Sequence, residues 1–276
     1  MKFLTTNILF FISIISICQS GYAQELQNQV EINFVTYNIA GLPDTLTSSR
    51  EVSKADKRFP VIANFLKQFD VIGIQEIFIP ERHIIEDKLK TYYLVHGTDT
   101  GNITKMYGSG VYIFSRWPIL KSAFETWDQA EDYDSVSHKG FVIATTKVSE
   151  DLQIDIYSLH AQAGHQYVHI RENQYKQFHS ALKKYSLGQG RPVIIMGDFN
   201  SGPNKRDEYF AFENDMGMKN VNDELKGVDH ILYSDNKSEW SIEVVQVKKI
   251  EMKRYEGKRL SDHEPVCAKL RFIRNK

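Results

Sequence analysis

Eight polar side chains that could support hydrolytic chemistry each stand close to an apolar, strand-like run of the chain. Carboxylate and amide oxygens are hard ligands that suit Mg²⁺, and imidazole adds proton transfer. This combination favours magnesium-assisted phosphoryl chemistry over zinc hydrolysis, and the sequence contains no HExxH, GxSxG or P-loop pattern. The eight residues are Asn38, Glu76, His160, Asp198, Asn200, Asp229, Asp262 and His263.

Each of these signals also has a plain structural interpretation. Residues 197–200 could be a loop with an Asx turn, residues 261–263 a turn before a strand, and Glu76 a carboxylate at the rim of the sheet. Their shared position is more informative, because a rigid sheet can direct the side chains at its strand ends into one cleft. The sequence therefore predicts one polar site at the ends of several strands.

The elements that must position this site are short apolar strands with few helices between them. Helical spacing follows Pro60 over residues 61–69, and a second helix is expected over residues 170–182. Many strands with few helices indicate two sheets packed together with helices outside. Strands are expected at residues 30–35, 71–74, 110–114, 141–146, 152–159, 192–196, 230–233 and 266–272.

Composition places the chain among ordinary globular proteins. Apolar residues make up 42% and charged residues 25% of 276 residues, which argues against disordered and fibrous classes. The formal net charge of −1 provides no global positive field for nucleic acid. Two cysteines exclude a disulfide scaffold, and Cys267 lies in an apolar run typical of a buried structural thiol.

Residues 1–23 are interpreted as a signal peptide rather than as part of the fold. Lys2 precedes an apolar core over residues 8–17, and Gly21 and Ala23 occupy the small-residue positions of a cleavage site. The alternatives are a retained membrane anchor and a lipoprotein attached through Cys18. Residues 24–276 contain no linker or repeat and are expected to form a single catalytic domain. The protein is thus predicted to be secreted, periplasmic or exposed at the cell surface.

The order of the polar segments resembles the endonuclease/exonuclease/phosphatase superfamily, which has the DNase-I-like fold. This resemblance implies an α/β four-layer sandwich, in which two packed mixed β-sheets are flanked by helices. The matching segments are Thr36-Tyr37-Asn38, Gln75-Glu76, His160, Gly197-Asp198-Phe199-Asn200, Val228-Asp229-His230-Ile231-Leu232 and Ser261-Asp262-His263.

Within the superfamily, the chain is most similar to neutral and secreted sphingomyelinases. Three further segments carry this resemblance, namely residues 108–116, Ser137-His138-Lys139-Gly140 and His160-Ala161-Gln162-Ala163. The resemblance implies a secreted Mg²⁺-dependent phosphodiesterase that cleaves sphingomyelin or a related phosphosphingolipid into ceramide and a phosphorylated headgroup. Other divalent cations are possible.

The resemblance also implies roles for individual residues. Glu76, Asn38 and Asp262 would hold the metal. His263 would accept the proton of the attacking water and Asp229 would orient its ring, while Asp198 would orient the water. Asn200 and His160 would bind the substrate phosphate and the leaving group. Lys139 would contact the substrate phosphate or simply occupy a turn before Gly140.

Two other functions remain open at this stage. One is a secreted metal-dependent endonuclease on the same fold, and the other is a non-catalytic relative that binds lipid or polyanions. The preferred interpretation expects a phosphosphingolipid substrate at a membrane surface, with peripheral membrane contact. It expects no nucleic acid and no obligate protein partner.

Residues 245–255 match a hairpin that dips into the bilayer in some bacterial sphingomyelinases. This chain has Ile250, Met252 and Tyr255 there but no Trp or Phe, and six basic residues lie between Lys248 and Arg259. The stretch could be a basic rim for anionic groups or a solvated charged hairpin. Trp117 and Trp127 are alternative candidates for membrane contact.

Overall fold

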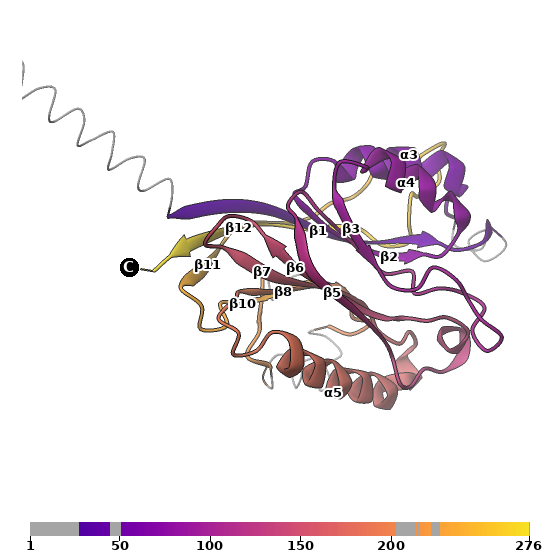
Figure 1. The fold of residues 1–276 in the computed structure, drawn as a ribbon. Helices are drawn as coiled ribbons and strands as arrows, with labels where there is room; N and C mark the ends of the chain where they lie inside the picture. Colours follow the sequence, from indigo (N-terminus) through magenta and orange to yellow (C-terminus); the bar gives the residue numbers. More distant parts are fainter. Residues whose placement is uncertain (1–27, 45–50, 203–213, 215, 222–226, 276) are drawn as a thin grey trace, which may run out of the picture.

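Two six-stranded β-sheets form the centre of the computed structural model (Figure 1), which describes residues 28–44, 51–202, 214, 216–221 and 227–275. The first sheet has the order β11 (Trp240–Lys249), β12 (Val266–Arg274), β1 (Gln29–Gly41), β2 (Val71–Ile77), β4 (Tyr112–Ser115) and β3 (Tyr93–His96). The second sheet has the order β5 (Ile119–Thr126), β6 (Gly140–Lys147), β7 (Gln153–His160), β8 (Val193–Asp198), β10 (Asp229–Ser234) and β9 (Lys219–Asn220).

The sheets and helices stack into four layers. Helices α3 (Ala55–Leu66) and α4 (His83–Lys88) cover the first sheet, and α5 (Val168–Tyr185) covers the second (Figure 1). Successive residues of β1 show why the strand is buried from Phe34 onward. Phe34 packs between the sheets while Val35 packs under the helices, so both faces of the strand are buried. Parallel pairs β1–β2 and β7–β8 make both sheets mixed, which confirms the predicted fold class.

The eight strands predicted from the sequence are the interior strands of the two sheets. The four that were not predicted, β3, β5, β9 and β11, are the four edge strands. An edge strand has one neighbour and often one solvated face, so its apolar pattern is weaker. In β11 a register shift between Val244 and Gln246 also interrupts the two-residue period.

Helix α3 begins before Pro60 rather than after it, so its predicted start was wrong. The buried guanidinium of Arg58 explains the earlier start, because it donates to the carbonyl oxygens of Ser53 (2.9 Å) and Ala40 (2.6 Å). These bonds hold the first turn in place even though Pro60 has no N–H to donate. The helix ends at Leu66, and the expected helix over residues 170–182 lies within α5.

The segment after β11 does not form an apolar tip. Ile250, Met252 and Tyr255 are partly buried and pack against the apolar cluster beneath α3. Trp127 is 4% exposed and Trp117 packs against the core between the sheets, so membrane contact through Trp127 was a wrong expectation. Cys267 is buried with a pKa raised by that burial to about 12, which confirms a structural thiol.

The predicted signal peptide at residues 1–23, with Cys18, lies outside the described residues. Within the described part of the chain, no helix is both long and apolar enough to cross a membrane.

Candidate active site

Strand register brings three of the predicted catalytic residues side by side. His160 at the end of β7 is the pairing partner of Asp198 at the end of β8, which pairs in turn with Asp229 at the start of β10. From the other sheet, Asn38 on β1 donates its side-chain Nδ2–H to Asp198 Oδ2 (3.0 Å). The site therefore lies where the ends of both sheets meet.

A second contact between the sheets supports the backbone on which Glu76 is placed. Gln75 accepts a hydrogen bond from Thr36 on β1 (3.2 Å) and donates to Ser158 on β7 (3.0 Å). Glu76 follows with a φ of 56°, and Asn200 has a φ of 51°, a left-handed conformation that is uncommon for residues other than glycine. Such strained positions concentrate at functional sites, where the surrounding structure holds them.

His263 and Asp229 form a hydrogen-bonded pair. The Nδ1–H of His263 donates to Asp229 Oδ2 (2.8 Å), and its Nε2 lies 3.7 Å from Asp198 Oδ2. Burial disfavours the charged ring, but attraction to Asp229 and Asp198 outweighs it and raises the pKa of His263 well above its ordinary value. The pair fixes which nitrogen faces the centre of the site, namely Nε2.

His160 approaches the same carboxylate as His263. Its Nε2 lies 3.5 Å from Asp198 Oδ2, 3.9 Å from Glu76 Oε1 and 3.0 Å from Lys139 Nζ. The ring is almost fully buried, and the carbonyl oxygen of His160 accepts the indole N–H of Trp127 (2.7 Å). Two imidazole rings thus converge on Asp198 Oδ2.

Lys139 does not simply occupy a turn. Lys139 is 6% exposed, and its ammonium lies 2.5 Å from Asp134 Oδ1 while also donating to His160. The other oxygen of Asp134 accepts the backbone N–H of Ala163 (2.7 Å), so the pair supports the segment after β7. The next residue must be Gly140, because a Cβ there would lie 2.0 Å from the carbonyl oxygen of Glu125.

Asp134 is a site residue that the sequence did not single out. It belongs to the short 3-10 helix η3 (Asp132–Val136), and residues 131–134 contain three acids typical of a solvated loop. Only the tertiary fold distinguishes Asp134, whose side chain is buried, from its exposed neighbours.

The remaining predicted residues join the cluster through short bridges. Asn200 donates its backbone N–H to Asp198 Oδ1 (2.9 Å) and its side-chain Nδ2–H to the carbonyl oxygen of Ala161 (2.9 Å). Asp262 follows Ser261, whose hydroxyl donates to the carbonyl oxygen of Asn38 (2.7 Å). The structure thus gathers all nine predicted residues around the ends of the two sheets.

The donor set of this cluster fits a divalent cation. Burial raises the pKa of Asp198 well above its ordinary value, although attraction to His263 opposes that effect. Asp229 Oδ1 is buried and has no hydrogen-bond partner within the described residues. Ligand atoms of Asp198, Asp229 and His263 lie within 4.8 Å of one another. Asp229 and His263 bond each other within this group, and the assignment of Glu76, Asn38 and Asp262 as oxygen ligands of Mg²⁺ stays a prediction.

Comparison with known proteins places the chain in a family. Residues 35–263 match the model of the Endonuclease/Exonuclease/phosphatase family, and the chain belongs to this family. A phospholipase C of Staphylococcus aureus is 26% identical over 244 residues, which cover 80% of this chain and 69% of that protein. A sphingomyelinase C of Bacillus cereus is 26% identical over 159 residues, so the match spans 50% of this chain and 47% of that relative.

A solved structure shares the fold. The beta toxin of Staphylococcus aureus, in a variant with bound magnesium ions, superposes with a TM-score of 0.68 and 20% sequence identity. The superposition covers 90% of this chain and all of the toxin chain. This likeness agrees with the two mixed sheets described above.

The buried pair of Asp134 and Lys139 leads to a stability prediction. Asp134→Asn keeps an acceptor for the Ala163 N–H but leaves the ammonium without its counter-ion, and breaking a buried pair in this way costs about 3–5 kcal/mol. We expect urea unfolding to show a loss of that size. The matched control, Glu150→Gln, removes an exposed partner of Lys147 and should cost under about 1 kcal/mol. Equal stability of the two variants would contradict the buried-pair assignment.

Proposed function

We propose that this chain is a metal-dependent phosphodiesterase that hydrolyses sphingomyelin or a related phosphosphingolipid to ceramide and the phosphorylated headgroup. The observation that carries the proposal is the convergence of His160 and His263 on Asp198 Oδ2, at 3.5 and 3.7 Å. Two imidazoles facing one carboxylate can supply an acid and a base to one phosphoryl group. The relatives named sphingomyelinase C and phospholipase C support a lipid substrate.

In the proposed reaction, water attacks phosphorus and the bond between phosphorus and the ceramide oxygen breaks. A cation bound to the nearby carboxylates would offset the attraction of Asp229 and Asp198 for a proton on His263 and so favour the neutral ring. In that neutral form His263 Nε2 takes the proton of the attacking water, while Asp229 holds the opposite ring nitrogen and stabilises the imidazolium. Asp198 orients the water, and Asn200 donates to a phosphate oxygen. His160 faces the leaving side and stabilises or protonates the departing ceramide alkoxide, and Lys139 Nζ, which donates to His160 Nε2, can supply the proton.

Glu76, Asn38 and Asp262 would hold a magnesium ion, although other divalent cations are possible. When bound, the ion neutralises negative charge that develops on the phosphoryl oxygens. The magnesium ions in the beta toxin structure, which shares the fold, support this choice. We further propose that residues 24–276 act as one catalytic domain, exported by the signal peptide at residues 1–23.

A substrate panel tests the proposal. Purified protein with Mg²⁺ would be incubated in parallel with sphingomyelin, related phosphosphingolipids and plasmid DNA, and the released headgroup and nicked DNA would be measured. We expect headgroup release and intact plasmid. Plasmid cleavage without release of any headgroup would instead support the endonuclease alternative.

Peripheral membrane contact is proposed at a set of exposed apolar residues close to Lys139. The side chains of Ile103, Met106 and Tyr133 are 105%, 70% and 79% exposed. Lys105, between the first two, donates its ammonium to the carbonyl oxygen of Ser137 (2.8 Å), and Tyr133 lies in η3 beside Asp134. Large apolar side chains kept in water near a lipid-cleaving site are suited to entering the membrane interface.

This surface predicts a difference between two forms of the lipid. Ile103→Asp with Met106→Asp should lower turnover on vesicles by about tenfold or more, because each lost apolar contact is worth about 1.5–3 kcal/mol when fully buried. Turnover of a short-chain, monomeric phosphosphingolipid should be unchanged. The control is Leu120→Asp, which changes an apolar residue that is 48% exposed. Leu120 lies at the start of β5, whereas Thr126 at the end of β5 pairs with Gly140, next to Lys139. Equal losses on vesicles and on the monomeric lipid would refute membrane contact here.

A further inference from the structure

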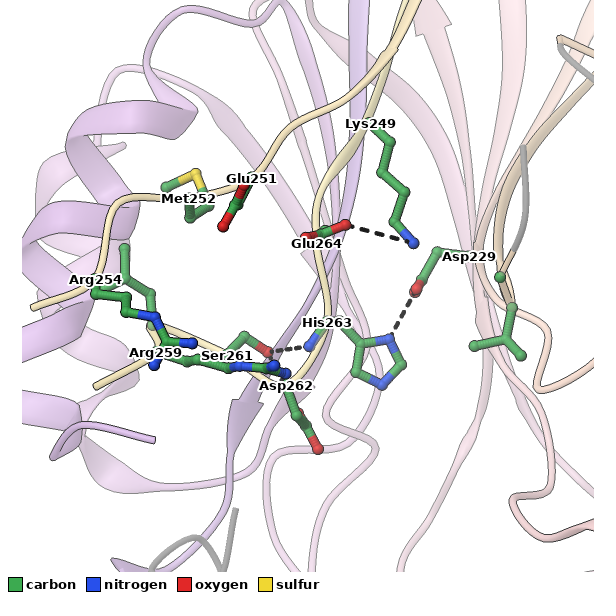
Figure 2. Close-up of a pocket in the computed structure, with 13 residues that line it drawn as sticks. Asp229, Lys249, Glu251, Met252, Arg254, Arg259, Ser261, Asp262, His263 and Glu264 are labelled. Atoms are coloured by element: carbon green, nitrogen blue, oxygen red, sulfur yellow. Dashed lines mark hydrogen bonds and ion pairs between the residues drawn. The ribbon is translucent and has the colours of Figure 1, made fainter. Parts of the chain in front are cut away.

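A pocket of about 300 Å³ lies directly beside the His263–Asp229 pair (Figure 2). The segment that connects β11 to β12 forms most of its wall, and the end of β11 and the start of β10 with the residues before it form the rest. The lining residues are Gly227, Val228, Asp229, Lys249, Glu251, Met252, Arg254, Arg259, Leu260, Ser261, Asp262, His263 and Glu264.

The connecting segment is anchored to the body of the protein. Arg259 exchanges backbone hydrogen bonds with residues 51–53 through Ser53 (3.0 Å) and Glu51 (3.1 Å). Met252 and Tyr255 pack against the apolar cluster beneath α3. The turn between Tyr255 and Lys258 is closed by a pair of backbone hydrogen bonds. The pocket wall is therefore a built part of the fold, and its side chains project from a fixed backbone.

Two guanidinium groups define one side of the pocket. On the other side, Lys249 forms an ion pair with Glu264 (3.6 Å) and Asp229 bonds His263, as Figure 2 shows. Arg254 donates from one guanidinium nitrogen to the carbonyl oxygen of Gly257 (3.0 Å) and makes no other hydrogen bond within the described residues, so its remaining N–H groups can bind a ligand. Arg254 and Arg259 lie together in Figure 2, facing the space enclosed by Glu251 and His263.

The chemistry of the described lining favours one kind of headgroup over another. Quaternary ammonium groups are held by cages of Phe, Tyr and Trp, and none of the thirteen described lining residues is of these types. Guanidinium groups present several fixed N–H donors, which match the oxygens of phosphate, carboxylate and neighbouring hydroxyl groups.

We infer that this pocket recognises a hydroxyl-rich phosphorylated headgroup, such as a phosphorylated polyol, and that choline is not the preferred headgroup. This inference rests on the proposed function, which it deepens by naming the headgroup class. Arg254 and Arg259 are then specificity-determining residues, and they act by donating to headgroup oxygens beside His263. The net charge of the pocket does not by itself determine the headgroup preference, because Glu251 and Glu264 line the pocket together with the two arginines.

The test compares three ceramide phosphodiesters that differ only in headgroup: inositol, ethanolamine and choline. Wild-type protein should show a kcat/KM for the inositol lipid at least about tenfold above that for sphingomyelin, the size of one lost charge-assisted hydrogen bond. Arg254→Gln with Arg259→Gln should abolish that preference by lowering kcat/KM for the inositol lipid alone. The matched control, Lys253→Gln with Lys258→Gln, removes the same charge from exposed residues of the same segment that do not line the pocket.

Two outcomes would overturn the inference while leaving the proposed function intact. In the first, wild-type protein cleaves sphingomyelin as fast as the inositol lipid or faster. In the second, the double arginine variant and the double lysine variant lose the same fraction of kcat/KM, and they lose it for all three lipids. If no lipid is cleaved, the proposed function fails, and a binding measurement still decides the pocket. Inositol phosphate should raise the Tm of the wild-type protein, and phosphocholine should not. Inositol phosphate should leave the Tm of the double arginine variant unchanged. Equal rises in the wild-type Tm with the two ligands would overturn the inference.

Discussion

Replacing His263 by alanine is expected to lower kcat by about 10²–10⁴-fold, the range typical of a lost general base. The reason is geometric, because Asp229 holds Nδ1 at 2.8 Å and thereby presents Nε2 to the centre of the site. KM should change much less, since the ring acts on the water and not on the lipid chains. Steady-state kinetics on mixed lipid–detergent micelles would separate the two constants.

Two further variants show whether the effect belongs to the pair. Asp229→Asn should also lower kcat strongly, because the amide no longer stabilises the imidazolium. His83→Ala removes a histidine outside the candidate site, whose ring bonds the carbonyl oxygen of Pro80 (2.9 Å), and it should leave kcat unchanged. Circular dichroism would confirm that each variant is folded. A kcat near wild type in His263→Ala would mean that another group takes the proton.

The fold could be predicted wherever both faces of a strand are covered. Residues 193–196 of β8 are apolar without interruption because one face packs between the sheets and the other beneath α5. Strand β11 lies at an edge, carries exposed polar residues and contains a register shift, so its pattern is not periodic over its length. Local hydrophobic pattern reports burial, and edge strands are the least buried part of a sheet.

The candidate site could be predicted in part for a related reason. His160, Asp198 and Asp229 adjoin interior strands, so finding those strands also places the residues at one edge of a sheet. The pairing of Asp134 with Lys139 could not be found in this way. It joins a 3-10 helix to the residue just before β6, and no periodicity links a loop carboxylate to a buried ammonium.

The same limit applies to the segment between β11 and β12. The sequence leaves a basic rim and a solvated charged hairpin open for this stretch, and it does not show that Ile250 and Met252 pack beneath α3. That packing turns the basic residues Arg254 and Arg259 toward the site. Which side of a loop faces the protein is decided by contacts distant in sequence, which a local pattern does not contain.

The balance of buried charge in the site leads to the metal prediction. Glu76, Asp198 and Asp229 are buried carboxylates, while the nearby ammonium of Lys139 already pairs with Asp134. Carboxylates buried close together repel one another, so a cation that binds them should stabilise the folded protein. Binding and catalysis can therefore be measured separately.

Chelation with EDTA is expected to abolish turnover, and added Mg²⁺ should restore it. In the absence of substrate, Mg²⁺ at one hundred times its Kd should stabilise the wild-type protein by about 2.7 kcal/mol, seen as a rise in Tm. Glu76→Gln should lose both the activity and the Tm shift, because the amide keeps the shape of the side chain but removes the charge that attracts the ion. Glu150→Gln, which changes an exposed carboxylate that pairs with Lys147, should retain both. Full turnover in EDTA, or an undiminished Mg²⁺ shift in Glu76→Gln, would show that Glu76 does not hold the metal.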